Sequence, residues 1–478
     1  MKLSALAAAQ LDPDPEITGL TPDSRAVRGG FLFAALPGLA ADGTAFIPQA
    51  EKMGAAAILA RPGAMTRLPL IADEEPRRRL SQMAARFHPR QPRFAAGVTG
   101  TNGKTSTVIF AAALWELLGE RSGSVGTLGA RARGFDRQLG HTTPEPVTLH
   151  ETLDAMAAHG VTHLALEVSS HALAHYRADG VRFSAAAFTN LTQDHLDFHG
   201  GLESYFQAKL RLFMELLPAD GAAVINMDGE RAHEVYDVAA ARGVEIISTG
   251  RRGKTLKITA LTPEPSGLAL RVEANGRAHA LKLPLIGAFQ AENALTAAGL
   301  VMASGKDASE VLPLLERLPG VPGRMQLAAS VAGAGIYVDY AHTPDAVATA
   351  LAAIRPHAKG KVVAIIGAGG DRDRLKRPLM GQAAASGADL VIVTDDNPRT
   401  EDAAMIRREI LRGCLAALEI GERADAIAHG VALLRSGDVL LIAGKGHETG
   451  QIVRGVTLPF DDVETAQRAA SLRGEARL

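Results

Sequence analysis

Short apolar runs, each ending in a polar or glycine-rich turn, recur along most of the chain. Four of them lie in the middle, at residues 94–100, 162–170, 185–191 and 221–228, and four lie nearer the end, at 335–342, 361–370, 389–397 and 438–446. Helical stretches separate the runs. Nearly continuous apolar strands that alternate with helices are typical of a parallel sheet covered on both faces. The pattern therefore predicts an α/β fold whose ligands bind at the carboxyl ends of the strands, where the polar turns lie.

Two segments rich in proline and glycine divide the chain into predicted domains. A length of 478 residues is too great for one ordinary core and favours several domains. Pro89 and Pro92 precede a new strand, and prolines and glycines crowd residues 319–323. We therefore expect three α/β domains, at residues 1–88, 89–321 and 322–478.

Charge balance and cysteine count exclude several classes of function. Lys plus Arg (51) nearly equals Asp plus Glu (52), so no overall field favours nucleic acid or an anionic membrane. Cys414 is the single cysteine, which excludes an internal disulfide and a multi-cysteine metal site. No run reaches the roughly 20 apolar residues that a membrane helix needs, and the N-terminal stretch does not fit a signal peptide. We expect a cytoplasmic protein.

The stretch GVTGTNGKTS, residues 97–106, differs by one residue from the usual phosphate-binding loop. That pattern places four residues between its first glycine and Gly-Lys-[Ser/Thr], whereas five residues separate Gly97 from Gly103. A predicted strand before the loop and a helix after it still direct backbone N–H groups at a phosphate. We expect Lys104 to neutralise terminal phosphate charge and the Thr105 hydroxyl to bind Mg²⁺.

Three further residues are candidates for the same chemistry. Glu167 lies at the end of one predicted strand, and His195 follows another in FTNLTQDHLDFHG. A buried carboxylate near a nucleotide loop is costly unless it is paired or binds metal, but spacing alone leaves a structural role open for both residues. Lys209 lies on the predicted helix ESYFQAKLRLF, where the pattern by itself indicates a solvated surface charge.

These motifs, taken in order, resemble those of the Mur ligase family, the ATP-dependent amide-bond ligases of peptidoglycan precursor synthesis. The similar segments are TGTNGKTS, EVSSHAL, FTNLTQDHLDFHG, YFQAKLRLF, GAFQAENALTA, PGRMQ, VDYAHTPDAV, GAGGDRDRLKRPLM, TDDNPRTED and AGKGHE, with LTPDSRAVRGGFLFAALPG in the first block. They span almost the whole chain. The resemblance implies an N-terminal α/β substrate domain, a central P-loop parallel-sheet ATPase domain and a C-terminal Rossmann-like α/β domain.

Within the family, DNPR at Asp396–Arg399 resembles the members that use meso-diaminopimelate rather than L-lysine. Diaminopimelate carries a second carboxylate, which the planar guanidinium of Arg399 can bind through two hydrogen bonds. The resemblance implies that UDP-N-acetylmuramoyl-L-alanyl-D-glutamate, meso-diaminopimelate and ATP give the tripeptide nucleotide, ADP and phosphate through an acyl phosphate. The implied cofactors are ATP and Mg²⁺. We expect these small molecules as partners, no nucleic acid, no stable membrane insertion and a monomer.

The resemblance also implies residue roles. The catalytic residues would be Lys104, Glu167, His195 and Lys209. Thr105 and Glu167 would hold one Mg²⁺, and His195 would help to hold a second together with Lys209 as a carbamate. ATP, expected between the second and third domains, would be bound by Gly100, Thr101, Asn102, Gly103, Lys104, Thr105, Ser106, Asn293, Arg324, Asp339 and His342. The UDP-substrate would be bound by Ser24, Thr142, Thr143, Ser169, His175 and Arg177. Diaminopimelate would be bound by Arg372, Asp396, Asn397, Pro398, Arg399, Gly444 and Glu448.

Two positions depart from the family pattern. His141 stands where the family commonly has Asn, and His175 stands where it commonly has Gln. Both side chains can still donate a hydrogen bond. The loop around Arg372, DRDRLKR, would by itself be interpreted as a solvated charged loop.

Four alternative functions are left open. MurF and folylpolyglutamate synthase would share the ATP motifs but not DNPR together with the N-terminal DSR pattern. The L-lysine-adding form is disfavoured by Arg399. A non-catalytic ATP-binding module is disfavoured because Lys104, Glu167, His195 and Lys209 are all present.

Overall fold

The computed structural model describes residues 1–38, 42–192, 194 and 196–475. The chain divides into two compact units: the first unit comprises Met1–Leu256 and Leu295–Val311, and the second comprises Lys257–Ala294 and Leu312–Leu478. Parallel sheets flanked by helices occur in both units, so the predicted α/β class is confirmed. The predicted domain boundaries near residues 88 and 322 stay a prediction.

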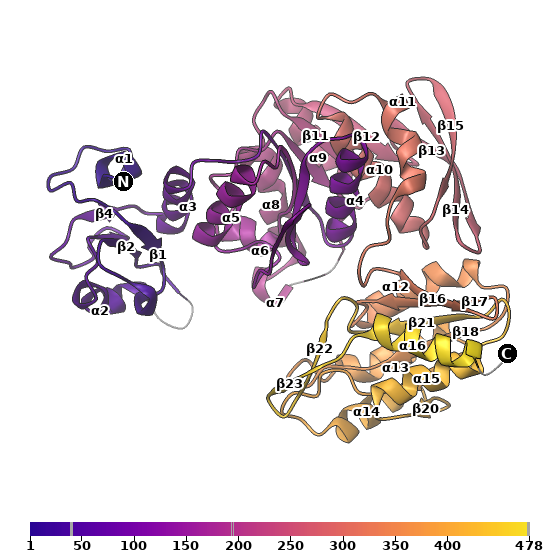
Figure 1. Ribbon diagram of the computed structural model, residues 1–478. Coiled ribbons are helices and arrows are strands. Elements are labelled where there is room, and N and C mark those ends of the chain that lie inside the picture. The colour runs from indigo at the N-terminus through magenta and orange to yellow at the C-terminus, as the bar shows by residue number, and fades with distance from the viewer. Residues whose placement is uncertain (39–41, 193, 195, 476–478) are drawn as a thin grey trace. The chain divides into compact units, whose positions relative to one another are not determined.

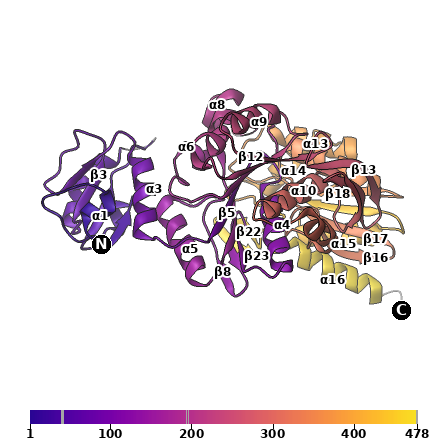
Figure 2. The same ribbon diagram turned by 90° about the horizontal axis from the view of Figure 1, so that it is seen from above.

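The N-terminal part of the first unit is a parallel sheet of order β1-β2-β3-β4. Its apolar core includes Leu3, Leu32, Leu59 and Leu80. In the view of Figure 2, α3 lies between this sheet and α5, and Ser81 of α3 donates a hydrogen bond to the Arg177 carbonyl at 3.0 Å. The elements are α1 (Leu3–Ala7), β1 (Gly19–Thr21), η1 (Ser24–Ala26), β2 (Phe31–Ala34), η2 (Gly43–Phe46), α2 (Ile47–Lys52), β3 (Ala57–Ala60), β4 (Leu70–Ala72) and α3 (Pro76–Phe87).

The central sheet has eleven strands, of which those in the first unit follow the order β12-β11-β10-β5-β9-β6-β7-β8. Strands β12 to β6 run parallel, and β7 and β8 are antiparallel additions. The elements are β5 (Phe94–Thr99), α4 (Lys104–Leu117), β6 (Ser122–Gly126), β7 (Gly129–Ala132), β8 (Phe135–Arg137), α5 (Pro146–Ala158), β9 (His163–Glu167), α6 (Ser170–Ala174), β10 (Ala185–Phe188), α7 (Leu196–His199), α8 (Leu202–Arg211), η3 (Leu212–Leu216), β11 (Ala222–Asn226), α9 (Ala232–Ala241) and β12 (Glu245–Gly250).

Helices cover both faces of this central sheet. Helices α5, α6, α8 and α9 contribute side chains such as Leu153, Leu173, Phe206 and Val235 to one core, and α4 lies on the opposite face (Figures 1 and 2). Because the strands are covered on both faces, they are almost wholly apolar, as the sequence pattern predicts.

The second unit holds a six-stranded sheet of order β16-β17-β21-β18-β19-β20. Helices α12, α13 and α14 pack on one face, and α15 and α16 on the other. The remaining elements of the chain are β13 (Leu256–Glu264), β14 (Gly267–Ala274), β15 (Arg277–Leu283), α10 (Ala288–Met302), α11 (Ala308–Val311), η4 (Leu312–Arg317), β16 (Gln326–Val331), β17 (Ala334–Asp339), α12 (Pro344–Ile354), η5 (Arg355–His357), β18 (Val362–Ile366), α13 (Lys376–Gly387), β19 (Leu390–Val393), α14 (Ala403–Leu411), β20 (Leu418–Glu419), α15 (Arg423–Leu433), β21 (Val439–Ala443), β22 (Gly450–Val453), β23 (Val456–Pro459) and α16 (Asp462–Glu475). The first residue of β13, the end of α10 and all of α11 belong to the first unit, and the other elements in this list belong to the second.

Each main sheet carries polar turns at one edge. The turns after β5, β9, β10 and β6 follow the carboxyl ends of parallel neighbours, as do those after β17, β21, β18 and β19. These are the places where open α/β sheets bind ligands. Within the described part of the chain, no helix is both long enough and apolar enough to cross a bilayer.

Candidate active site

The glycine-rich loop lies between β5 and α4 and is tied to the turn after β10. The Thr101 N–H donates to the Asn190 carbonyl at 2.9 Å, and the Asn102 N–H donates to Asn190 Oδ1 at 2.9 Å. Gly100 has φ +149°, and a Cβ at this position would collide with Thr189 Oγ1. The loop therefore needs glycine here both for its backbone conformation and for its close approach to β10.

Lys104 begins α4 and curls back over the loop. Its ammonium group donates to the carbonyls of Gly100 at 2.9 Å and Thr101 at 2.8 Å. The N-terminus of a helix of this length attracts anions, and a lysine over the same loop adds a full positive charge. The arrangement is suited to a terminal phosphate.

Glu167 ends β9 beside the loop and is almost fully buried, with 1% of its surface exposed. Its carboxylate accepts hydrogen bonds from Thr105 Oγ1 at 3.0 Å, the Thr127 N–H at 2.8 Å and Thr127 Oγ1 at 3.4 Å. These donors offset the cost of burying the charge. A threonine hydroxyl and a carboxylate side by side are hard oxygen donors, the type that Mg²⁺ prefers.

Lys209, on α8, is also buried, with 1% of its surface exposed. Its Nζ donates to the Gly100 carbonyl at 2.7 Å, the same oxygen that Lys104 contacts, and lies 4.3 Å from the centre of the Tyr205 ring. Burial, reinforced by the charge of Lys104, holds the pKa of Lys209 well below its ordinary value. The site thus favours the neutral amine that carbamylation requires.

Magnesium ligands of the predicted kind fit this corner, although one of them is not placed. His195 lies outside the described residues. Among the residues that are described, no group of three or more His, Cys, Asp or Glu side chains could hold a metal ion. Of the first predicted Mg²⁺ site, both Thr105 and Glu167 are described, and phosphate oxygens would complete its shell. Of the second predicted site, only Lys209, which would bind as a carbamate, is described.

Gly126→Ala is expected to displace Glu167 and to lower kcat/KM for Mg–ATP by about 10²-fold, the scale of effect that a misplacement of about 1 Å produces. A Cβ on Gly126 would lie 2.6 Å from Glu167 Cδ and closer still to Oε1. The Mg²⁺ concentration for half-maximal rate should rise as well. Gly320→Ala is the matched control, because a Cβ there meets nothing within 4 Å. Unchanged Mg²⁺ dependence in Gly126→Ala would mean that the Glu167 position is not critical.

The predicted UDP-substrate residues of the central sheet lie next to Glu167. Thr143 Oγ1 donates to the Glu167 carbonyl at 2.8 Å and accepts from the Ser169 N–H at 3.0 Å. Arg177 donates to the Thr143 carbonyl at 3.1 Å and pairs with Glu145 at 2.6 Å. Thr142 and Thr127 are joined through their hydroxyl oxygens at 3.1 Å. Four predicted UDP-substrate residues, Thr142, Thr143, Ser169 and Arg177, therefore lie close together beside Glu167.

The remaining predicted UDP-substrate residues, Ser24 and His175, lie outside the hydrogen-bonded group beside Glu167. Ser24 lies in the N-terminal sheet region and donates to Gln49 Oε1 at 3.1 Å. His175 follows α6, and burial, with the charges of Arg77 and Arg177, lowers its pKa. His141 is exposed on the loop that leads to Thr142. His141 and His175 are the two departures from the family pattern, and their roles stay predictions.

Predicted nucleotide-binding residues of the second unit gather around β17. Asn293 Nδ2 donates to Gln290 Oε1 at 3.0 Å, and Gln290 donates to the Arg324 carbonyl at 3.4 Å. Asp339 ends β17, accepts from two backbone N–H groups at 2.7 and 2.9 Å, and has its pKa raised by burial. The Arg324 guanidinium lies over the ring of Tyr340 at 4.8 Å, and His342 Nδ1 lies 2.8 Å from the Tyr340 carbonyl.

The predicted diaminopimelate residues form two groups of opposite charge. Arg399 donates to the Gly370 carbonyl at 2.7 Å, and a Cβ on Gly369 would lie within 4 Å of both the Arg399 and Arg372 side chains. Among the described residues, neither guanidinium is within 4.0 Å of a carboxylate. Both are therefore available to a carboxylate from outside the chain.

The acidic group follows β19 and β21. Asn397 donates to Glu448 Oε2 at 2.8 Å and accepts from the Lys445 ammonium at 3.1 Å. A Cβ on Gly444 would lie 2.5 Å from Asp396 Oδ2, so this glycine leaves room for the Asp396 carboxylate. Pro398 is buried between Asn397 and Arg399. Glu448 also pairs with the buried Lys445 at 3.3 Å. The Asp396 and Glu448 carboxylates, together with the two guanidiniums, suit a zwitterionic ligand with more than one carboxylate.

Several residues that support the site were missed by sequence reasoning. Thr127 binds Glu167, Tyr205 binds Thr101 through its hydroxyl at 3.1 Å, and Lys445 is fully buried beside Glu448. Arg377 is fully buried and pairs with Glu401, which in turn accepts from the Asp371 N–H. Tyr205 lies in the family-like segment YFQAKLRLF and Lys445 in AGKGHE, so those segments could have indicated both residues. Thr127 lies in none of the family-like segments.

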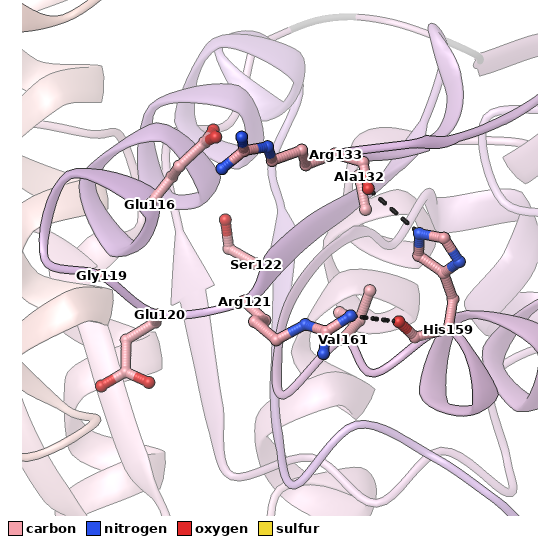
Figure 3. A pocket seen from close by; sticks show the side chains of 9 residues that line it. All are labelled: Glu116, Gly119, Glu120, Arg121, Ser122, Ala132, Arg133, His159 and Val161. Carbon is pink, nitrogen blue, oxygen red and sulfur yellow. Dashed lines mark hydrogen bonds between the residues drawn. The ribbon is translucent and has the colours of Figure 1, made fainter.

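A separate cavity of about 410 Å³ lies at the other edge of the central sheet, near the starts of β6 and β9 (Figure 3). Arg121 donates to the His159 carbonyl at 2.6 Å, and His159 Nε2 lies 3.1 Å from the Arg133 carbonyl. No predicted site residue lines this cavity. The predicted chemistry therefore concentrates at the carboxyl edge of the sheet.

The fold and the loop at the head of α4 define an α/β protein of the phosphate-binding-loop class. Three family models match the chain: "Mur ligase family, catalytic domain" over residues 16–88, "Mur ligase middle domain" over residues 98–301, and "Mur ligase, glutamate ligase domain" over residues 323–446. The chain belongs to the Mur ligase family.

Similar proteins include UDP-N-acetylmuramoyl-L-alanyl-D-glutamate–2,6-diaminopimelate ligases of Caulobacter vibrioides and Bradyrhizobium diazoefficiens. The first is 51% identical and covers 98% of each chain, and the second is 49% identical and covers 96% of each. A solved structure of a ligase with the same name is 32% identical, covers 99% of each chain and has a TM-score of 0.76. MurF of Thermotoga maritima, solved with ADP, shares the fold at 19% identity, with a TM-score of 0.62 over 96% of this chain and 98% of MurF.

Proposed function

We propose that this chain is an ATP-dependent ligase that joins meso-diaminopimelate to UDP-N-acetylmuramoyl-L-alanyl-D-glutamate, the MurE-type step of peptidoglycan precursor synthesis. One observation carries the proposal: Arg372 and Arg399, whose guanidinium groups pair with no carboxylate of the described residues, lie in the same region as Asp396 and Glu448. Relatives that are 44–51% identical over nearly the whole chain carry the name of this activity. A zwitterion with a carboxylate at its far end matches the charges of this region better than L-lysine does.

In this proposal, the first unit activates the substrate carboxylate. A carboxylate is a poor acylating agent because its leaving group would be oxide, so ATP converts it to an acyl phosphate and the incoming amine then displaces phosphate. Bound Mg²⁺ would supply charge that offsets the repulsion between the carboxylate and the γ-phosphate. Lys104 places an ammonium group over the loop that would hold the phosphates, and Thr105 and Glu167 supply the oxygen donors. Lys209, as a carbamate, would add an anionic ligand.

The second unit would bind the nucleotide and the amino acid. Asn293, Arg324, Asp339 and His342 are proposed for ATP. Arg372 and Arg399 would hold the far carboxylate of diaminopimelate, while the carboxylates of Asp396 and Glu448 would hold its ammonium group. That orientation leaves the other amine to attack the acyl phosphate. The proposed domain boundaries are residues 1–88, 89–321 and 322–478, and we propose a cytoplasmic monomer that acts on small molecules.

The test is phosphate release from Mg–ATP and the UDP-dipeptide with a panel of amino acceptors. We expect kcat/KM for meso-diaminopimelate to exceed that for L-lysine by at least about 30-fold, since stranding one partner of a buried charge pair costs about 2 kcal/mol or more. Equal values for L-lysine would refute the role of Arg399. Preference for D-alanyl-D-alanine would indicate the MurF reaction, and no turnover with any acceptor would indicate a non-catalytic module.

A further inference from the structure

Thr127 lies between the two sets of residues that the proposed function assigns to magnesium and to the UDP-substrate. It follows β6 in the turn to β7. Strand β6 pairs with β9 so that Val125 faces Leu166 in register, which brings the Thr127 turn beside Glu167. On its other side, the Thr127 hydroxyl reaches Thr142. No predicted role falls on Thr127.

The contacts of Thr127 differ in kind. Its backbone N–H donates to Glu167 Oε1 at 2.8 Å, and this bond is fixed by the turn. Its hydroxyl has two possible acceptors, Glu167 Oε2 at 3.4 Å and Thr142 Oγ1 at 3.1 Å. A hydroxyl has one proton to donate, so it serves one acceptor well at a time.

The choice between these acceptors depends on what Thr142 does. With Thr142 donating to Thr127 Oγ1, the Thr127 proton is directed at Glu167 Oε2, which also accepts from Thr105. When Thr142 instead donates its proton to an anionic group of a bound substrate, its oxygen becomes an acceptor for Thr127. The Thr127 proton then turns away from Glu167, and a lone pair of Oε2 becomes available.

We propose that the Thr127 hydroxyl is a hydrogen-bond relay that couples binding of an acceptor group at Thr142 to the availability of Glu167 as a magnesium ligand. The inference rests on the proposed function and deepens it. It makes Thr127 a positioning residue, because it acts on the metal site through Glu167 and contacts neither substrate nor nucleotide itself. UDP-substrate and Mg–nucleotide should then strengthen each other's binding, and by linkage the factor is the same in both directions.

A purely structural role for Thr127 gives a different expectation. The backbone bond to Glu167 survives any side-chain replacement that keeps the turn, so Thr127→Val removes only the hydroxyl. If the hydroxyl merely filled space, the valine variant would bind each ligand with the wild-type coupling. Thr107→Val is the matched control, because Thr107 is fully buried on α4 and no described residue bonds its hydroxyl.

The experiment is calorimetric titration of the full chain with a non-hydrolysable ATP analogue, with and without UDP-N-acetylmuramoyl-L-alanyl-D-glutamate. Each titration is run with Mg²⁺ and with chelator, so that only the Mg²⁺-dependent part of the coupling is attributed to the relay. We expect the wild type to show a Mg²⁺-dependent factor of about 5 or more, at the lower end of usual coupling factors. Thr127→Ser and Thr107→Val should keep this factor, and Thr127→Val should lower it to below about 2.

The outcomes separate the relay from the function on which it rests. Wild-type coupling in Thr127→Val, or no Mg²⁺-dependent coupling in a wild type that turns over, overturns the relay alone. A wild type that binds no UDP-dipeptide and releases no phosphate overturns the proposed function. Should Thr127→Val not fold, Thr142→Val removes the other end of the relay and must lose the same Mg²⁺-dependent coupling for the proposal to stand.

Discussion

Lys209→Ala is expected to lower kcat by about 10²-fold or more, the range measured when one preorganised electrostatic group is removed from an active site. Lys209 is buried, shares the Gly100 carbonyl with Lys104 and has a pKa well below its ordinary value. Such a position is unfavourable for an ammonium ion, because burial and the nearby charge of Lys104 both disfavour the protonated form. A neutral amine in this place can add to CO2 and release one proton, and the charge of the resulting carbamate would be offset by Lys104 and Mg²⁺.

The measurement is phosphate release by Lys209→Ala with and without added short carboxylic acids. A carboxylate that enters the space left by the side chain should restore part of the rate, because it replaces the anionic oxygen ligand. Lys306→Ala is the control, since Lys306 pairs with Glu120 away from the loop and should retain normal turnover. Near-normal turnover in Lys209→Ala, or failure of every small acid to restore activity in a folded variant, would contradict the carbamate role.

The burial of Lys209 shows what the local pattern predicts and what it misses. Tyr205, Phe206, Lys209 and Leu210 share one face of α8, and all four are buried. Residues four apart lie on the same helical face, so the period places Lys209 on the apolar side even though its charge suggests solvent. The solvated surface charge that the residue type predicts is therefore wrong, and only the family resemblance indicates a role for Lys209.

The strands and the loop after β5 could be predicted because short-range pattern determines them. Apolar runs of strand length and the glycine–lysine–threonine order are local properties, and the predicted strands occur where expected. Thr127 could not be predicted, because its contact with Glu167 depends on the pairing of β6 with β9. These strands are neighbours in the sheet, but β7, β8 and α5 lie between them along the chain. Arg377 is similar: the run DRDRLKR indicates a solvated loop, which holds for the exposed Arg372, but Arg377 is fully buried against Glu401 and Glu409.

Arg399→Ala is expected to raise KM for meso-diaminopimelate by at least about 30-fold, because losing one partner of a charge-assisted pair costs about 2 kcal/mol or more and each 1.4 kcal/mol is tenfold. The backbone at this position should persist, since the Arg399 N–H donates to the Ile452 carbonyl at 2.9 Å and the Arg454 N–H donates back to the Arg399 carbonyl. The effect is therefore confined to the guanidinium. KM for ATP should change little, because the nucleotide residues gather around β17 instead.

The decisive measurement is the pair of KM values in Arg399→Ala, Arg399→Lys and Arg408→Ala. Arg399→Lys keeps the charge but loses the two-pronged geometry, so it should recover only part of the affinity. Arg408 lies on α14 with an exposed side chain and contacts Met405, so Arg408→Ala should behave as wild type. The selectivity for meso-diaminopimelate over L-lysine must fall together with the affinity, because L-lysine has no far carboxylate to lose. Equal changes in KM for meso-diaminopimelate and KM for ATP would instead mean that Arg399 stabilises the second unit as a whole. The argument that its charge selects meso-diaminopimelate would then no longer hold.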